Sequence, residues 1–360
     1  MERRSFLKKA GVGLAAGAVA TPALAQNAPT IKWRMASSFP KSLDTLHGSA
    51  EFLVKRIAEM SGGKFQIQLF AAGEIVPGPG VHDAVKDGTV EIGFTCSYYY
   101  FGKEPTYCID TAIPFGMNAR QVKAWYRQGN GQKLMNDFFA KSNIISLPSG
   151  NTGVQMGGWY RKEIKSAADF KGLKMRVAGL AGAVLSKMGV VPQQIAGSDI
   201  YPALEKGTID AVEWVGPYDD QKLGFNKVAK YYYYPAWWEG GPQISTYVNL
   251  KKWAELPKEY QAMIEAACAE CDTEMCARYD AKNPAALKQL LASGTKVLPF
   301  PKDVMEASYK AATEYYVETS AKYPDFKKIY DDYKKFLDDQ NFWYRVAENE
   351  FAKFMFSRKS

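Results

Sequence analysis

Three charged side chains stand at or near the ends of short apolar segments. Arg176 lies in a segment that predicts a buried strand, and Glu213 and Trp214 end a second such segment. Glu239 follows two tryptophans and precedes two glycines. The planar N–H donors of an arginine match both oxygens of a carboxylate at once. The sequence therefore predicts a cleft that binds a small carboxylate and is lined by an arginine, two glutamates and aromatic rings.

The two glutamates need a partner of their own if they line such a cleft. Buried carboxylates beside a bound carboxylate would repel it and would tend to hold a proton. A hard cation, held by the acids and shared with the ligand, removes this conflict. The alternative is that one glutamate is protonated and donates a hydrogen bond to the ligand.

A simpler interpretation also stays open at this point. The acids could be unrelated residues at strand ends, and Arg176 could pair with a core acid. Trp214, Trp237 and Trp238 could be core residues, and at least one of the last two is expected to be one.

The segments that would position these residues begin with an alternation of strands and helices. Strand-like apolar runs alternate with helix-like ones, and glycine-rich stops separate them. This order is typical of a doubly wound α/β sheet. The expected strands are 31–36, 65–69 and 90–95, with helices at 43–60 and 81–86 between them. Further helices at 119–128 and 132–140 and a strand at 144–147 follow.

A second unit of the same kind begins near Gly153. Its strands are predicted at 174–177, 191–194 and 211–214, with helices at 181–188 and 201–206. Residues 84–91 and 203–210 share the pattern of a helix end, a glycine stop and a strand start. The sequence thus predicts two similar α/β lobes. Because ligands bind beyond the carboxyl ends of strands in such sheets, residues 96–101 should face Glu213 and Trp214.

The last third of the chain is mostly helical. Strands at 231–234 and 243–249 are expected to pass between the lobes, and helices are expected at 257–279, 285–291 and 303–322, with a strand at 296–300. Apolar and aromatic residues then repeat at helical spacing from about Asp325 to Arg358. This long last helix could brace both lobes, or it could bind a partner, because Trp, Tyr and Phe are enriched at interfaces.

The chain starts with features of an exported protein. Arg3 and Arg4 precede a short apolar run from Ala10 to Ala20, and Ala23-Leu-Ala25 offers a cleavage site. The paired arginines resemble a twin-arginine export signal. The apolar run is too short to anchor the chain in a bilayer. The mature protein is therefore expected to begin at Gln26, outside the cytoplasm.

Composition argues against several other classes of protein. The formal net charge is +8, but the basic residues are scattered among acids, which gives little support to nucleic-acid binding. Neither histidine lies near a plausible nucleophile, and the motifs of serine hydrolases and zinc proteases are absent from the sequence. The five cysteines are an odd number, so at least one is unpaired, and Cys268, Cys271 and Cys276 are expected to be buried helix residues. We expect a binding protein that is not an enzyme.

Several longer segments resemble the solute receptors of TRAP transporters. These are the twin-arginine start, the run Lys-Gly-Leu-Lys-Met-Arg-Val at 171–177, the turn at 207–210 and the Glu213-Trp214 pair. Within that family, residues 98–100, 151–159, 191–195, 213–220 and 237–241 resemble the branch that binds 2-oxo acids (α-keto acids). The resemblance covers essentially the whole mature chain.

This resemblance implies a two-lobed periplasmic binding protein fold with a ligand cleft between the lobes and a long C-terminal helix. It implies a receptor that closes on a small 2-oxo monocarboxylate such as pyruvate and delivers it to a membrane permease. A receptor for lactate or another 2-hydroxy acid that uses Ca²⁺ is the alternative. The last helix resembles one that is exchanged between two subunits, which implies a homodimer.

The resemblance also assigns roles to individual residues. Arg176 would hold the ligand carboxylate, and Gln155 would contact both ligand and cation. Glu213, Glu239 and the Trp214 carbonyl would complete a cation site, for Na⁺ or alternatively Ca²⁺. The predicted substrate-binding residues are Asn151, Gln155, Arg176, Trp214, Tyr99 and Tyr100, with Tyr98 considered beside the other two tyrosines.

The expected division of the chain follows from these points. The expected segments are a signal peptide at 1–25, lobe I at 26–150 with later segments crossing back, lobe II at 151–250, helical segments that complete the lobes at 251–324, and the long dimerisation helix at 325–360.

Overall fold

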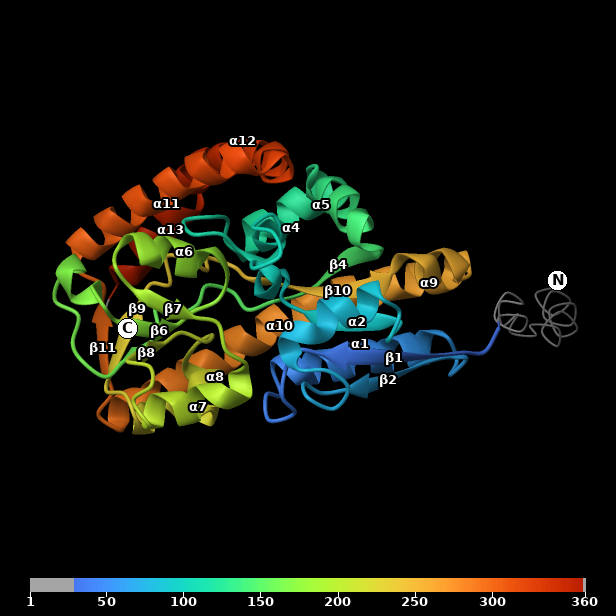
Figure 1. The fold of residues 1–360 in the computed structure, drawn as a ribbon, viewed down its shortest axis with the longest axis horizontal. Helices are drawn as coiled ribbons and strands as arrows, with labels where there is room; N and C mark the ends of the chain where they lie inside the picture. The colour runs from blue at the N-terminus through green and yellow to red at the C-terminus, as the bar shows by residue number, and fades with distance from the viewer. Residues whose placement is uncertain (1–28, 359–360) are drawn as a thin grey trace, which may run out of the picture.

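The computed structural model describes residues 29–358, which form two α/β lobes side by side (Figure 1). The signal segment expected at 1–25 lies outside the described residues. Each lobe contains one sheet, so the predicted two-lobed α/β fold is confirmed.

Lobe I is built on a five-stranded sheet in the order β2-β1-β3-β10-β4. β1 is parallel to β2 and β3, whereas β10 runs antiparallel to β3 and β4. The strands are β1 (Ile31–Ser37), β2 (Phe65–Phe70), β3 (Ile92–Thr95), β4 (Ile144–Asn151) and β10 (Gln243–Asn249).

Lobe II is built on a six-stranded sheet in the order β11-β9-β5-β8-β6-β7. β6 is parallel to β7 and β8, and β5 is antiparallel to β8 and β9. The sequence did not predict β5, because two residues are too few to show alternation. The strands are β5 (Trp159–Tyr160), β6 (Lys174–Arg176), β7 (Val191–Gln193), β8 (Ala211–Val212), β9 (Tyr231–Tyr234) and β11 (Lys296–Pro299).

Helices bury apolar faces against these sheets. In α1, Leu46, Leu53 and Ile57 repeat at helical spacing and are buried. The helices associated with lobe I are α1 (Leu46–Met60), α2 (Val81–Lys86), η3 (Ser97–Tyr100), α3 (Tyr107–Thr111), α4 (Ala119–Gln128), α5 (Gly131–Phe139) and α9 (Leu250–Glu255). Those associated with lobe II are α6 (Gly179–Lys187), α7 (Gly197–Glu205), α8 (Pro217–Lys222) and α11 (Lys302–Lys322).

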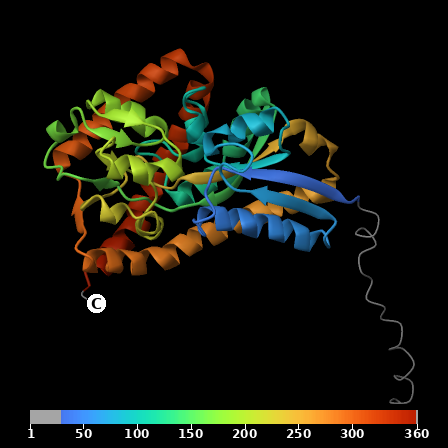
Figure 2. The same ribbon diagram turned by 60° about the horizontal axis from the view of Figure 1, so that its bottom comes forward.

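One long helix, α10 (Lys258–Ala292), runs along both lobes (Figures 1 and 2). It packs against α1 and β4 of lobe I and against α8 of lobe II. The sequence predicted two helices here, and that prediction is wrong, because Pro284 lies inside a continuous helix. Proline removes one helical hydrogen bond. Buried residues on both sides of it, Tyr279 and Ala286, keep the helix packed through this point.

The last segment is two helices, α12 (Pro324–Val346) and α13 (Glu348–Phe356), where the sequence predicted one. Ala347 separates them with φ −89° and ψ −74°. The segment from 324 to 356 has no glycine, and its only proline is at the helix start, so the pattern gave no sign of this break. α12 buries Phe326, Ile329, Tyr333 and Leu337 and packs against α4, α5 and α11, whereas α13 buries no residue. The break thus falls beyond the last buried residue of α12.

All five cysteines are free. Cys268 and Cys271 are buried in α10 as expected, whereas Cys276 of the same helix is only half-buried. Within residues 29–358, no helix has both the length and the apolar composition needed to cross a membrane.

Candidate functional site

The side chains of Arg176 and Glu213 lie together because their strands are neighbours. β6 ends at Arg176 and pairs in parallel with β8, where Arg176 is opposite Val212. Glu213 follows Val212 directly, so the carboxyl ends of the two strands bring Arg176 and Glu213 together. This is the edge at which sheets of this kind bind ligands.

Arg176 and Glu213 form a buried ion pair. Nη1 of Arg176 donates to Glu213 Oε1 at 2.6 Å and to the Glu213 carbonyl at 2.7 Å. The guanidinium lies over the Trp214 ring, with 5.0 Å between its carbon and the ring centre. Both hydrogen bonds use Nη1, and Nε has no partner among the residues that the structure describes. The edge formed by Nε and Nη2 can therefore hold a ligand carboxylate with two parallel bonds.

A group of buried oxygens without hydrogen-bond partners marks the second half of the site. Within the described part of the chain, Gln155 Oε1, Glu213 Oε2 and both carboxylate oxygens of Glu239 are unpartnered. Gln155 and Glu239 lie on crossing segments that are hydrogen-bonded, since the Gln155 N–H donates to the Glu239 carbonyl at 3.2 Å. Nearly all buried polar atoms in folded proteins have partners, so such a group points to a ligand.

Burial raises the pKa values of both glutamates of the site, Glu213 and Glu239. Burial raises the pKa of Glu239 well above its ordinary value, the charge of Glu213 raises it further, and Arg176 opposes the shift. Burial also raises the pKa of Glu213, and Arg176 again opposes it. These effects show that the three groups interact electrostatically.

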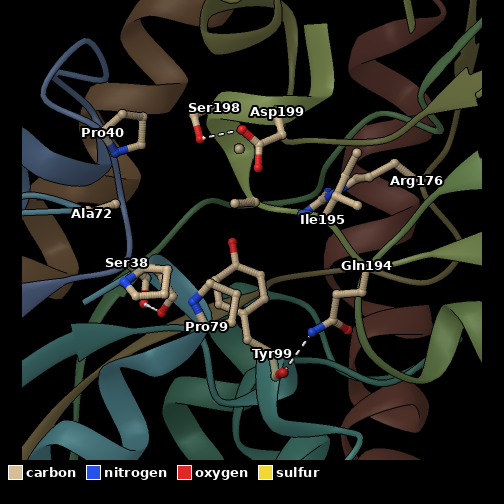
Figure 3. Close-up of a pocket in the computed structure, with 15 residues that line it drawn as sticks. Ser38, Pro40, Ala72, Pro79, Tyr99, Arg176, Gln194, Ile195, Ser198 and Asp199 are labelled. Carbon is tan, nitrogen blue, oxygen red and sulfur yellow. Dashed lines mark hydrogen bonds between the residues drawn. The ribbon is translucent and has the colours of Figure 1, made fainter. Parts of the chain in front are cut away.

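Two cavities open at this edge of the lobes. The outer one, about 160 Å³, is lined by Arg176 and by residues of both lobes (Figure 3). The inner one, about 10 Å³, is lined on the lobe II side by Gln155 and Trp214 and on the lobe I side by Cys96 and Tyr98. Of the predicted range 96–101, Cys96, Tyr98 and Tyr99 thus line the same cavity as Trp214.

The three consecutive tyrosines of η3 do not all face the cleft. Tyr98 lines the inner cavity and Tyr99 lines both cavities. Tyr100 lines neither, because its hydroxyl hydrogen-bonds Thr95 and the His82 N–H inside lobe I. The sequence predicted alternating faces on a strand. The segment is instead a 3₁₀ turn, which has about three residues per turn.

Asn151 is buried next to the site but lines neither cavity. Its side-chain amide donates to the Gly241 carbonyl at 3.0 Å, and its oxygen accepts from the Gly153 N–H at 2.9 Å. Asn151 therefore fixes the course of the crossing segments. Sequence reasoning gave no role to Gln194, which lines the outer cavity, although it belongs to the motif at 191–195.

The unpartnered oxygens fit a hard metal cation. Two carboxylates and one amide supply only oxygen ligands, which suit Na⁺ or Ca²⁺. No group of three His, Cys, Asp or Glu side chains that could hold a metal occurs in residues 29–358.

Comparison with known proteins gives a consistent result. The family model described as bacterial extracellular solute-binding protein, family 7, matches residues 36–322. A monocarboxylate 2-oxoacid-binding periplasmic protein of Nostoc sp. is 47% identical over 360 residues, which cover 98% of this chain and 99% of that protein.

Two solved structures are also similar over nearly their full length. A TRAP transporter solute-binding protein of Bordetella bronchiseptica is 55% identical, with a TM-score of 0.90, over 91% of this chain and 98% of that one. It is a mixed-occupancy dimer with calcium and picolinate in one active site. A TRAP periplasmic solute-binding protein of Pseudoalteromonas atlantica with bound sodium and pyruvate is 36% identical, with a TM-score of 0.88, over 92% and 100% of the two chains.

Proposed function

The chain belongs to bacterial extracellular solute-binding protein family 7 and is a TRAP solute-binding protein, and on this premise we propose that its cleft binds a small 2-oxo monocarboxylate such as pyruvate together with a metal cation. One observation carries the proposal. Nε of Arg176 and buried oxygens of Gln155, Glu213 and Glu239 have no partner among the described residues. The charges of Glu213 and Glu239 both act on Arg176, and Gln155 is hydrogen-bonded to Glu239 through the backbone.

The roles divide between the two halves of the site. The Nε and Nη2 edge of Arg176 binds the ligand carboxylate. Gln155, Glu213, Glu239 and the Trp214 carbonyl bind the cation, and the cation in turn binds the ligand. A 2-oxo acid suits this arrangement, since its carboxylate and its keto oxygen can both approach the same cation.

The tyrosines and Asn151 complete the cleft in different ways. Tyr99, which lines both cavities, forms the wall on the side of lobe I. The hydroxyl of Tyr100 and the amide of Asn151 are held by protein groups. We therefore propose that Tyr100 and Asn151 support the walls of the cleft.

The identity of the cation stays open between Na⁺ and Ca²⁺, because the similar structures contain one or the other. The names of the similar proteins favour a 2-oxo acid over a 2-hydroxy acid.

The location and partners follow from the family. The receptor acts in the periplasm, and we propose a twin-arginine signal within residues 1–25. It delivers its ligand to TRAP permease subunits in the membrane. We propose a homodimer that uses the C-terminal helices, where Phe351, Phe354 and Met355 of α13 are exposed.

Ligand-dependent melting tests this function. Pyruvate with Na⁺ or Ca²⁺ should raise the melting temperature, because a ligand that binds only the folded state stabilises it. Pyruvate should be recovered chemically unchanged, because a receptor binds its ligand without converting it, whereas an enzyme would convert it. Mass spectrometry and metal analysis of the purified protein should find a small 2-oxo acid and Na⁺ or Ca²⁺. No stabilisation by any 2-oxo acid, with either cation, would contradict the proposal.

A further inference from the structure

The two lobes touch at the mouth of the cleft through an exposed glutamine. Gln194 follows β7 in lobe II, and its Nε2 donates to the Tyr99 carbonyl in lobe I at 2.7 Å (Figure 3). Its Oε1 accepts the Gly179 N–H at the start of α6, at 3.4 Å. One side chain therefore links η3 of lobe I to the start of α6 in lobe II.

The contact next to Gln194 leaves no space for a side chain. Gly179 has φ +64°, and a Cβ atom there would lie 2.8 Å from the Tyr98 ring. Glycine is needed both for this backbone conformation and for the close approach. Lobe II thus meets η3 at two consecutive tyrosines, Tyr98 through Gly179 and Tyr99 through Gln194.

Tyr99 separates the two cavities. Among residues 29–358, Tyr99 alone lines both the outer and the inner cavity. Its ring stacks on Tyr98, with 5.1 Å between the ring centres. Figure 3 shows the ring pointing into the outer cavity, with Arg176 across from it. A displacement of η3 would move this ring and open a path from the inner cavity to solvent.

A second contact between the lobes lies away from the mouth. Thr45 of lobe I donates to Asp219 of α8 at 2.6 Å, and Tyr279 of α10 donates to the same carboxylate at 2.7 Å. All three residues are buried, and α10, to which Tyr279 belongs, packs on both lobes. This contact lies at the shared helix, whereas Gln194 is exposed and lines the outer cavity.

We propose that Gln194 is a closure latch, a positioning residue that holds Tyr99 over the bound ligand through the Tyr99 carbonyl and so slows ligand release. The latch rests on the proposed function only for the identity of the ligand. It forms when the lobes close and is broken when they open. It should therefore act on the dissociation rate more than on the association rate.

Three variants separate the latch from other roles. Gln194→Ala removes both hydrogen bonds, and Gln194→Glu keeps an acceptor for Gly179 but loses the donor to Tyr99. Gln193→Ala is the matched control, because Gln193 is the adjacent glutamine of the same motif and its side chain has no hydrogen bond to any residue that the structure describes. Stopped-flow tryptophan fluorescence with pyruvate and CaCl₂ or NaCl measures both rates.

We expect Gln194→Ala and Gln194→Glu to raise the dissociation rate by about 2- to 10-fold, the effect of one net hydrogen bond. The association rate should change by less than about 2-fold, and the far-UV circular dichroism spectrum of the ligand-free protein should stay that of the wild type. Gln193→Ala should match the wild type in all three. Unchanged dissociation in Gln194→Ala, or a changed circular dichroism spectrum without ligand, would overturn the latch.

Failure of the latch and failure of the proposed function give different results. If the wild type binds pyruvate and Gln194→Ala releases it at the same rate, the latch alone is wrong. If the wild type does not bind pyruvate, the proposed function is wrong, and the latch is judged by small-angle X-ray scattering without ligand. Gln194→Ala should then have a larger radius of gyration than the wild type, and equal radii would contradict the latch.

Discussion

At the scale of single residues, Arg176 serves two partners with two edges of one guanidinium. Nη1 is committed to Glu213, so the ligand meets the edge that remains. The Trp214 ring beneath the guanidinium fixes its plane. Lysine has a single ammonium group and could not serve both partners with the same geometry.

Replacement of Arg176 should therefore abolish most binding. We expect Arg176→Lys to keep the charge beside Glu213 and the fold, and to weaken pyruvate binding by about 2 kcal/mol or more through loss of the bidentate pair. Arg176→Ala should lose more, about 2–5 kcal/mol, and should also destabilise the protein by leaving Glu213 unpaired. Isothermal titration calorimetry measures the affinities, and unchanged affinity in the lysine variant would refute the assigned role.

Glu239 should make cation binding depend on pH. Its pKa is raised by burial and by Glu213, so without a cation the carboxyl group tends to hold a proton. A cation must displace this proton, and lower pH should weaken the combined binding of cation and pyruvate. Glu239→Gln should bind weakly and should lose part of this pH dependence, as calorimetry between pH 5 and pH 8 would show. Affinity that rises as pH falls would favour the protonated-glutamate alternative.

The raised pKa of Glu239 should also make the stability of the folded protein depend on pH. A carboxyl group whose folded pKa is raised contributes stability that is fully present below its unfolded pKa, about 4.3, and is lost as pH rises through the folded pKa. Without cations, raising the pH should therefore lower the melting temperature of the wild type more than that of Glu239→Gln.

At the scale of elements, α10 and α12 hold the lobes together while α13 extends from them. α10 packs on both lobes, and α12 packs on α4, α5 and α11. α13 exposes Phe351, Phe354 and Met355 and buries nothing. Such a helix is stable in water when a partner covers its apolar face.

Removal of α13 should separate a dimer without unfolding the lobes. A chain that ends at Val346 keeps every buried residue of α12, so it should fold and bind pyruvate with wild-type affinity. Light scattering should find it more dissociated than the full mature chain at the same concentration. A truncated chain that remains fully dimeric would exclude α13 from the interface.

At the scale of the whole molecule, the features set by local residue patterns were predicted better than the features set by long-range contacts. The spacing of apolar residues predicted α1, most strands and the position of Arg176 and Glu213 in or at the ends of two strands. The pairing of those two strands became visible only in the fold. The spacing could not predict that α10 continues through Pro284, because packing against both lobes decides that. No glycine or internal proline in the sequence indicated the helix break at Ala347.

The candidate site shows the same limit. Residue types and the family resemblance pointed to Gln155, Glu213 and Glu239, but only the fold shows that their oxygens are buried and without partners among the described residues. The 3₁₀ geometry of η3, which turns Tyr100 into the core and Tyr99 into the cleft, is not visible in a run of three tyrosines. Gln194 gained a role only when the facing lobe was in place.

The shared cation is the central claim, and its energetic reason is simple. Two like charges about 4 Å apart repel by about 4 kcal/mol at an effective dielectric constant of about 20. Glu213 and Glu239 would each impose such a cost on the ligand carboxylate if both were ionised, and Arg176 alone could not offset both. A cation turns this repulsion into attraction, so cation and ligand should bind with positive coupling.

Titration of pyruvate into protein stripped of Na⁺ and Ca²⁺ tests this claim most directly. The protein is held in choline buffer with a chelator, and the titration is repeated after one cation is restored, at pH 5.5 and pH 8. We predict little or no binding without a cation, recovery on addition of Na⁺ or Ca²⁺, and stronger recovery at pH 8. Full affinity in choline buffer with the chelator present, increasing at pH 5.5, would contradict the account.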